Sequence, residues 1–346
     1  MTGIVTVTAS AAIDQTYVLP RLEVGQLNRA VSAHREVSGK GVNVARAAQL
    51  GGATVSGVLA LGERDLPLMH DSGFGDILHA VTLPGHTRLN ATIIDARGIT
   101  TKVNEAAAPM TRVQWDELAE LALREVERLE ADWLVLCGTM PVLAESSHGE
   151  AGAPALVPFT ELVEEAAARG VRVVADTSGD SFDLLAGHLG MVALVKPNTQ
   201  ELAGFVGREL LTTGDVIQAA RELLVLGVET VYVSMGEDGA LGVSASGVWW
   251  AHAAAPALVN TAGAGDASLA GFLASALHAG PGGGRVLNVP RALATAAAWG
   301  ALAVSQATTL LSAPDTAPSA VVHEAPDPAR ALRDPARSQA TTRLTK

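Results

Sequence analysis

One stretch of the chain decides the fold: Asn260-Thr261-Ala262-Gly263-Ala264-Gly265-Asp266, which leads directly into the apolar run Ala267–Ala276. Glycines just before a helix let the backbone turn tightly, so that consecutive N–H groups can point at one anion. The helix N-terminus adds partial positive charge at the same place. Asp266 would then lie in the first turn, where it can accept a proton from an attacking hydroxyl. The stretch predicts an anion-binding turn with a catalytic base; a plain helix N-cap by Asp266 is the alternative for this stretch alone.

A second glycine turn, Ser38-Gly39-Lys40-Gly41-Val42-Asn43, also opens a helical stretch and carries a lysine inside the turn. Such a turn combines close backbone approach with a mobile positive charge, which suits a phosphate group. We therefore expect a phosphate near Lys40.

Two further segments follow predicted strands. In the first, Lys196-Pro197-Asn198-Thr199-Gln200-Glu201, an amide and a carboxylate lie three residues apart, so they share one face of a helical turn and can hold the water shell of Mg²⁺. The second, Ser234-Met235-Gly236-Glu237-Asp238-Gly239, can cradle nucleotide phosphate or ribose. Ligands of α/β proteins bind at the carboxyl ends of the strands, so these segments are expected to form one site.

Short β-branched runs alternate with longer amphipathic runs, which predicts a three-layer α/β/α fold with a mostly parallel central sheet. The predicted strands are Ile4–Thr8, Trp133–Cys137, Val171–Asp176, Ala193–Lys196 and Thr230–Ser234, and the predicted helices include Trp115–Leu129, Phe159–Arg169 and Asp215–Leu226. Gln26–Arg35 and Leu89–Asn104 read instead as extended segments. They predict a small β-sheet, from about 14–36 and 88–105, that acts as a lid and excludes water. An ordinary hairpin is the alternative.

Composition limits the functional classes. The chain has 346 residues and a formal net charge of -12, which argues against nucleic-acid binding because that requires a basic surface. The single cysteine, Cys137, excludes an intramolecular disulfide and fits a reducing cytoplasm. The uncharged stretch Ala292–Ser312 is long enough to cross a bilayer, but its Ala, Thr and Gly content favours a buried helix. We therefore expect a cytoplasmic protein that does not enter the membrane.

Periodicity fails after Ser312, so residues 1–312 are expected to form one domain. Residues 313–346 are expected to be a disordered tail, apart from a short helix near Ala329. Glu145–Pro154 reads as an exposed loop.

Taken together, these segments resemble the PfkB carbohydrate kinases, a ribokinase-like family, from about Val5 to about Thr309. The family's late signature resembles Asp-Thr-x-Gly-Ala-Gly-Asp, and its early one resembles Gly-Gly-Lys-Gly-x-Asn. The resemblance implies that Asp266 is the catalytic base and that the turn of Gly263, Ala264, Gly265 and Asp266 stabilises the transferring phosphoryl group. It also implies that Asn198 and Glu201 organise Mg²⁺, through water, with ATP. The nucleotide-binding residues it implies are Lys196, Asn198, Ser234, Gly236, Gly239 and Ser305, the last within Leu302–Gln306 near the adenine pocket.

Other segments are similar to the phosphosugar branch of that family. Thr87–Asn90 resembles its Thr-Arg-x-Asn, in which the arginine grips the phosphate already on the substrate. Thr139 lies where the branch often carries a serine hydroxyl. Lys40, Arg88 and Thr139 are thus predicted to form a phosphate clamp, with surface charge and a turn hydroxyl as the alternative. The substrate-binding residues implied are Asp14, Gly39, Lys40, Asn43, Arg88, Asn90 and Thr139.

Two departures from the branch bear on specificity. Ser10 and Ala11 replace an Asn-Pro corner, which leaves the exact sugar open. Asn260 replaces an acid near a monovalent-cation position of some relatives, so potassium dependence stays open.

The resemblance implies an ATP-dependent phosphorylation, with Mg²⁺, of a primary hydroxyl on a phosphorylated hexose. Fructose 1-phosphate is the first choice, and tagatose 6-phosphate and fructose 6-phosphate are alternatives. A plain-sugar or nucleoside kinase and a non-catalytic sugar- or nucleotide-binding regulator remain further alternatives. Exposed lid strands would also permit a homodimer.

Overall fold

The computed structural model describes residues 1–145, 155–280, 284–306 and 308–336. In these residues the strands are β1 Gly3–Thr8, β2 Ala12–Leu19, β3 Ser32–Ser38, β4 Thr54–Gly62, β5 Leu78–Leu83, β6 Leu89–Asp95, β7 Thr100–Asn104, β8 Trp133–Cys137, β9 Arg172–Asp176, β10 Val192–Val195, β11 Leu210–Thr212, β12 Thr230–Ser234, β13 Ala240–Ser244, β14 Gly247–Ala253, β15 Leu277–Ala279, β16 Arg285–Leu287, β17 Ala320–Glu324 and β18 Ala331–Ala336. The α-helices are α1 Lys40–Leu50, α2 Leu66–His70, α3 Arg112–Leu129, α4 Phe159–Ala168, α5 Asp180–Leu184, α6 Thr199–Val206, α7 Thr213–Val225, α8 Ala264–Ala276 and α9 Val289–Ala303, and a 3₁₀ turn, η3, spans Gly236–Asp238.

A ten-stranded sheet crosses the described part of the chain in the order β17-β14-β13-β12-β10-β9-β8-β1-β4-β5. Neighbours from β12 to β5 pair in parallel, whereas β13, β14 and β17 extend the sheet antiparallel. Every residue of β1 and of β8 is buried, as expected for strands covered on both faces. The predicted α/β fold with a mostly parallel sheet is confirmed.

Two apolar clusters lie on opposite faces of this sheet and complete the three layers. One cluster holds side chains of α3, α4, α6 and α7, and the other holds side chains of α1, α8 and α9. The Ala-rich stretch that begins at Ala292 forms most of α9, which packs against α8. Across the described residues, no helix combines the length and apolar character needed to cross a membrane.

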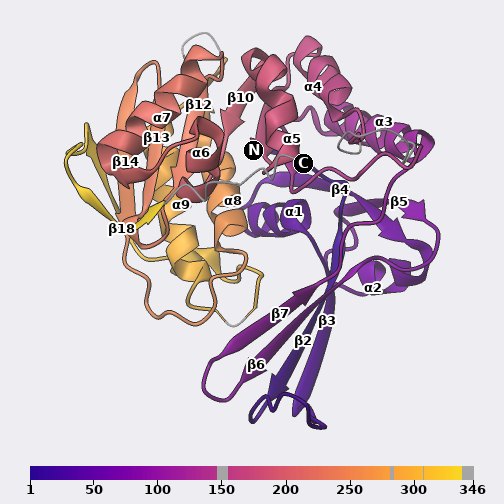
Figure 1. The fold of residues 1–346 in the computed structure, drawn as a ribbon. Helices are drawn as coiled ribbons and strands as arrows, with labels where there is room; N and C mark the ends of the chain where they lie inside the picture. The colour runs from indigo at the N-terminus through magenta and orange to yellow at the C-terminus, as the bar shows by residue number, and fades with distance from the viewer. Residues whose placement is uncertain (146–154, 281–283, 307, 337–346) are drawn as a thin grey trace, which may run out of the picture.

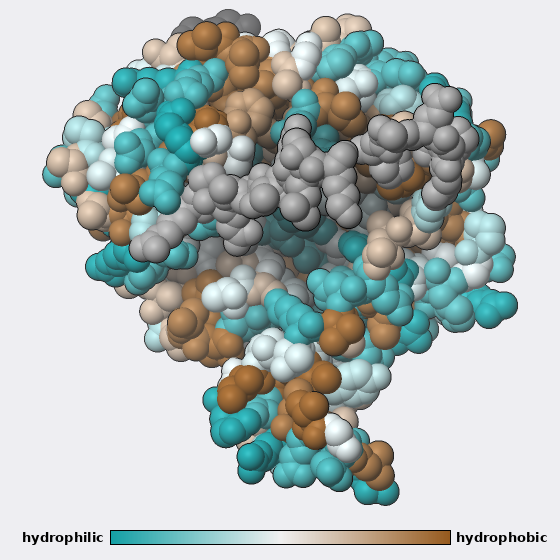
Figure 2. Space-filling view, in the orientation of Figure 1, coloured by the Kyte–Doolittle hydropathy of each residue, from teal (hydrophilic) through white to brown (hydrophobic). Residues whose placement is uncertain are grey.

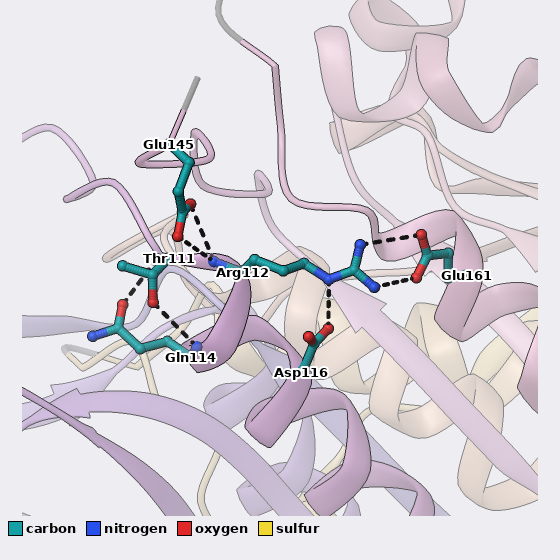
Figure 3. Close-up of polar contacts among 6 residues, drawn as sticks. All are labelled: Thr111, Arg112, Gln114, Asp116, Glu145 and Glu161. Carbon is teal, nitrogen blue, oxygen red and sulfur yellow. Dashed lines mark hydrogen bonds and ion pairs between the residues drawn. The ribbon is translucent and has the colours of Figure 1, made fainter. Parts of the chain in front are cut away.

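Local signals explain where α3 begins. Thr111 and Gln114 form a capping box, each side chain accepting from the other residue's backbone N–H. The backbone N–H of Arg112 donates to the Glu145 carboxylate, and its guanidinium contacts Glu161 of α4 at 2.7 Å (Figure 3). The start of α3 is thereby joined to α4 and to residue 145. The rest of the predicted loop, residues 146–154, lies outside the described residues.

A separate four-stranded sheet, in the order β3-β2-β6-β7, projects from the body (Figure 1). Both segments that the sequence predicts to be extended contribute to this sheet. In the segment Gln26–Arg35, the strand β3 begins at Ser32 rather than at Gln26. Strands β2 and β6 pair in parallel, with Asp14 opposite Asn90. The small sheet that the sequence predicts is therefore present.

The prediction of a disordered tail is wrong for residues 313–336. Strand β17 pairs with β14 at the edge of the central sheet, and β18 pairs with β11. Leu332 and Ala336 are buried, and a turn rather than a helix surrounds Ala329. Edge pairing rests on backbone hydrogen bonds, so a short strand can form here without the apolar periodicity that predicts one. Residues 337–346 lie outside the described residues.

Candidate active site

At the start of α8 the backbone packs closely against the segment around Thr309. Gly263 is its N-cap with φ 79°, and an added Cβ would lie 2.1 Å from the carbonyl oxygen of Thr309. Glycine is required on both grounds. No side chain caps this helix, and the backbone N–H of Ala264 makes only a long hydrogen bond, 3.4 Å, to the carbonyl of Thr261. The anion site at this turn stays a prediction.

Asp266 is buried in the first turn of α8. Its Oδ2 accepts from Nδ2 of Asn43 in α1 at 2.9 Å. Burial is the main cause that raises the pKa of Asp266 to about 6; the charge of Asp176 adds to the rise, and the Asn43 hydrogen bond opposes it. The alternative reading of Asp266 as an N-cap fails, because the cap is Gly263 and the carboxylate binds Asn43 instead.

Asp176, at the carboxyl end of β9, joins two lysines from distant parts of the chain. Its Oδ1 lies 3.1 Å from Nζ of Lys40 and 3.3 Å from Nζ of Lys196. Asp176 is fully buried and Lys196 is 5% exposed, whereas Lys40 is 35% exposed. The Asp176 charge keeps the pKa of both lysines above the ordinary value despite burial, and the lysines hold the pKa of Asp176 low. The cluster carries one excess positive charge beside Asp266.

The glycine turn before α1 places Lys40. Gly39 is the N-cap with φ 137°, and an added Cβ there would lie 2.7 Å from Cγ2 of Thr8. At Gly41 an added Cβ would lie 2.3 Å from Oγ1 of Thr8. The helix therefore begins directly against the end of β1, at the carboxyl edge of the sheet.

Asn198 and Glu201 form a capping box at the start of α6. The backbone N–H of Glu201 donates to Asn198 Oδ1 at 2.8 Å, and that of Asn198 donates to Glu201 Oε2 at 2.9 Å. The box uses one oxygen of the Glu201 carboxylate. The charge of Glu201 also raises the pKa of Lys40 and of Lys196, so this carboxylate lies near the lysine cluster. The pair has a structural role and also borders the site.

The turn that the sequence predicts to bind the nucleotide follows β12. Ser234 forms an isolated parallel bridge with Asn198, which brings this turn beside the start of α6. Gly236 has φ 54° and Gly239 has φ 88°, and a Cβ added at Gly239 would lie 2.3 Å from the carbonyl oxygen of Ala251. Ser305 follows α9, and its hydroxyl donates to the carbonyl of Leu302 at 2.7 Å.

The predicted sugar-side residues separate into two groups. Asn90 donates Nδ2 to Asp14 Oδ1 at 3.1 Å across the small sheet. Arg88 donates to the carbonyls of Ser10, Ala11 and Glu105, at 3.0, 3.2 and 3.3 Å respectively. Burial lowers the pKa of its guanidinium, and the charge of Asp14 offsets part of that effect.

The three residues of the predicted clamp have different surroundings. Arg88 binds the corner at Ser10 and Ala11, Lys40 binds Asp176, and Thr139 is exposed after β8. The clamp therefore stays a prediction.

Buried polar atoms without a hydrogen-bond partner in the described residues mark the carboxyl edge of the sheet. Such atoms are otherwise rare, so a group of them calls for a polar ligand or water. Those around the candidate site are Thr8 Oγ1, Ser10 Oγ, Asn43 Oδ1, Asn90 Oδ1, Asp176 Oδ2 and Thr177 Oγ1. A cavity of about 390 Å³ joins β7 to the segment before α8, lined by Thr100, Lys102, Leu258, Val259, Asn260 and Thr261. The small sheet and the α8 turn thus border a common space.

This arrangement can be compared with known proteins. A family model described as pfkB family carbohydrate kinase matches residues 3–316. The chain belongs to this family. The predicted ATP-dependent sugar kinase is confirmed at that level.

Among the similar curated proteins, the 1-phosphofructokinase of Rhodobacter capsulatus is 35% identical over 302 residues, covering 86% of this kinase and 90% of that protein. The 1-phosphofructokinase of Escherichia coli K12 is 30% identical over 274 residues, covering 78% and 83%. Phosphofructokinase-2 from Escherichia coli, solved in complex with potassium, matches at a TM-score of 0.76 and 25% identity, covering 91% of this chain and 96% of that one. A possible 1-phosphofructokinase from Thermotoga maritima shares the fold at a TM-score of 0.74 and 20% identity.

Sequence reasoning missed Asp176 as a site residue. The sequence places this residue only at the end of the predicted strand Val171–Asp176. A carboxylate at the carboxyl end of a buried parallel strand is the signal that could have drawn attention to it.

Proposed function

We propose that this kinase transfers the γ-phosphoryl group of ATP to a primary hydroxyl of a phosphorylated hexose, converting fructose 1-phosphate to fructose 1,6-bisphosphate. The observation that carries the proposal is the placement of Asp266. A buried carboxylate with a raised pKa lies in the first turn of a helix that no side chain caps, and a base beside helix N–H groups is the arrangement that phosphoryl transfer to an alcohol requires.

In the proposed reaction, the Asp266 carboxylate removes the proton of the attacking hydroxyl. The hydroxyl oxygen forms a bond to the γ-phosphorus while the bond from that phosphorus to the bridging oxygen breaks, and ADP leaves. The N–H groups at the start of α8 stabilise charge on the transferring group. Asn43 keeps the Asp266 carboxylate oriented toward the hydroxyl.

The lysine cluster supplies positive charge for phosphate. Asp176 neutralises one of its two lysines and holds both ammonium groups in place, which leaves a net charge of about one in a buried setting. Lys196 lies near Gly265, since a Cβ on that glycine would be 3.6 Å from Nζ. We assign Lys196 to the nucleotide side and Lys40 to the substrate side.

Magnesium fits this site through water and phosphate rather than through a dedicated protein cage. In the described residues, no group of three or more His, Cys, Asp or Glu side chains could hold a metal ion. Asn198 and Glu201 would hold Mg²⁺ through water, a mode that this ion favours. When bound, Mg²⁺ would neutralise charge on the ATP phosphates. Asn260 accepts from the backbone N–H of Ala262, and potassium dependence stays open.

Two observations support a sugar phosphate as the substrate: the names of the relatives and the residues of the small sheet. Curated relatives at 30–35% identity are named 1-phosphofructokinase. We assign Asp14 and Asn90 to sugar hydroxyls and Arg88, with Lys40 and Thr139, to the phosphate that the substrate already carries. The three carbonyls that now hold Arg88 would be exchanged for phosphate oxygens, which bind a guanidinium more strongly.

The small sheet is also a candidate surface for pairing with a second copy of the chain. Apolar side chains interrupt its polar surface (Figure 2), among them Val18, Val31 and Val103. Exposed apolar strands favour a partner. We propose a homodimer through this sheet, acting in the cytoplasm, where the buried thiol of Cys137 would stay reduced.

The test is coupled ADP release with Mg-ATP against fructose 1-phosphate, fructose 6-phosphate, tagatose 6-phosphate, fructose and ribose. We expect a clear preference for fructose 1-phosphate. Turnover with unphosphorylated sugars alone would contradict the phosphate clamp. If folded protein releases no ADP with any of these sugars, a non-catalytic binding protein would be favoured.

A further inference from the structure

The segment after residue 316 lies beyond the family match, yet it reaches the nucleotide-side turn. Strand β18 of this segment contacts η3. Two residues of the segment, Arg330 and Arg333, bind the side chain of Asp238 in that turn. Arg330 Nη2 lies 2.7 Å from Asp238 Oδ1, and the backbone N–H of Arg333 donates to Oδ2 at 2.7 Å. Both oxygens of this carboxylate are therefore held from the C-terminal segment.

Asp238 lies inside the turn whose glycines are assigned to the nucleotide. It is 1% exposed and stands between Gly236 and Gly239, both at positive φ. Its backbone carbonyl accepts from Nε1 of Trp250 in β14 at 2.7 Å. Three contacts from outside the turn thus fix this one residue, and two of the three come from the C-terminal segment.

Arg330 is itself held in place. Its guanidinium carbon lies 4.6 Å from the centroid of the Trp250 ring, a cation–π distance. Its carbonyl accepts from the backbone N–H of Thr213 at 2.9 Å, and the carbonyl of Pro328 accepts from Gly214 at 2.9 Å. These carbonyls satisfy N–H groups in the first turn of α7, which would otherwise lack partners. The C-terminal segment is thereby fixed to the body on both sides of Arg330.

We propose that Arg330 is a positioning residue for nucleotide binding, acting through Asp238 on the Ser234–Gly239 turn. The C-terminal segment that lies beyond the family match would then be part of the ATP side of the enzyme. The inference rests on the proposed function, since it assumes that this turn carries the nucleotide. A buried carboxylate that loses its guanidinium partner must move toward water or take up a proton, and either change displaces the turn around it.

The chain offers a matched control in Arg333. Its side chain meets Glu237 at 3.3 Å, with exposed fractions of 66% and 60%. Such surface pairs contribute little. Its bond to Asp238 comes from the backbone N–H, which a substitution of the side chain leaves intact. Arg333→Gln therefore removes a similar charge from the same C-terminal segment without unpairing Asp238.

The experiment measures kcat, the KM for ATP, the KM for the sugar phosphate and, by calorimetry, the Kd of ATP without sugar. It compares the wild-type chain with Arg330→Gln, Arg330→Lys and Arg333→Gln, and circular dichroism checks that each is folded. We expect Arg330→Gln to raise the KM and Kd for ATP about tenfold, with the KM for the sugar phosphate changed less than twofold. Arg330→Lys should recover part of the loss, and Arg333→Gln should match the wild type.

A double variant keeps the test decisive if Arg330→Gln folds poorly. Asp238→Asn in the Arg330→Gln background removes the unpaired buried charge, so the double variant should bind ATP more tightly than Arg330→Gln alone. Equal increases in both KM values, or unchanged ATP binding in Arg330→Gln, would overturn the inference while leaving the kinase proposal intact. A wild-type chain that neither binds nor turns over ATP would overturn both.

Discussion

Asn43 and Asp266 lie 223 positions apart in the chain and meet at 2.9 Å, with the amide Nδ2 donating to the carboxylate Oδ2. The contact joins the first turn of α1 to the first turn of α8, so the two glycine turns of the sequence lie side by side. It also opposes the burial that raises the pKa of Asp266 to about 6. A base with that pKa is deprotonated at neutral pH and still accepts a proton readily.

The pH dependence of the reaction should report this base. For the wild-type chain we expect kcat/KM to fall tenfold per pH unit below about 6, the pKa of Asp266. Asn43→Ala removes a hydrogen bond that favours the charged carboxylate, so the acid limb should move to higher pH. Rate profiles from pH 4.5 to 8.5 measure both. An acid limb that Asn43→Ala leaves in place would contradict the role given to this contact.

Lys40 and Asp176 should shift the acid limb in opposite directions. The charge of Asp176 raises the pKa of Asp266, and that of Lys40 lowers it. Asp176→Asn should therefore move the limb to lower pH, and Lys40→Met should move it to higher pH. Because Asp176 is a fully buried partner, its replacement should also cost about 3 kcal/mol of folding free energy or more. The same direction of shift in both variants would show that the cluster does not act on Asp266 electrostatically.

Asp266→Asn should abolish turnover and stabilise the fold. A carboxyl whose folded pKa rises from 3.8 to about 6 binds its proton more tightly in the native state. The contribution of Asp266 to wild-type stability therefore falls as pH rises from about 4 to about 6, and the variant escapes this loss. The gain should grow across that window and level off at about 3 kcal/mol above pH 6. Urea unfolding at pH 4 and pH 7.5 measures it, and a larger gain at pH 4 would contradict the assignment.

Gly263→Ala should disrupt the anion turn. The φ of 79° and the approach of 2.1 Å to the Thr309 carbonyl oxygen leave no room for a Cβ. We expect a loss of at least about tenfold in kcat and about 2 kcal/mol or more in stability. Gly204→Ala is the matched control, since Gly204 lies in α6 with open space around it. That change should stabilise by up to about 1 kcal/mol and leave kcat unchanged.

The parts of this molecule that were predictable from sequence depend on local patterns. Strands β8 and β12 have the predicted bounds, because short, mostly apolar runs are flanked there by clear helical periodicity. Gly263 and Asp266 were recognisable because a helix start needs particular residue types at a fixed spacing. Local signals of this kind need no knowledge of the sheet order.

The remaining features depend on which segments meet in space. Asp176 faces Lys40 and Lys196 because β9 lies near β1 and beside β10 in the sheet, an order that the sequence does not state. The pairing of β17 with β14 likewise depends on an available sheet edge rather than on an apolar pattern. Asn198 and Glu201 show that one spacing can have two meanings. An amide and a carboxylate three residues apart can cap a helix, as they do here, and the same spacing also predicts a magnesium site.

The central claim is tested most directly by identifying the product. Wild-type chain and Asp266→Asn are each incubated with Mg-ATP and fructose 1-phosphate, and phosphorus NMR follows the reaction. We predict a new phosphomonoester at carbon 6, formed in equal amount with ADP by the wild-type chain and absent with the variant. ADP without bisphosphate, or bisphosphate formed at the wild-type rate by Asp266→Asn, would contradict the account.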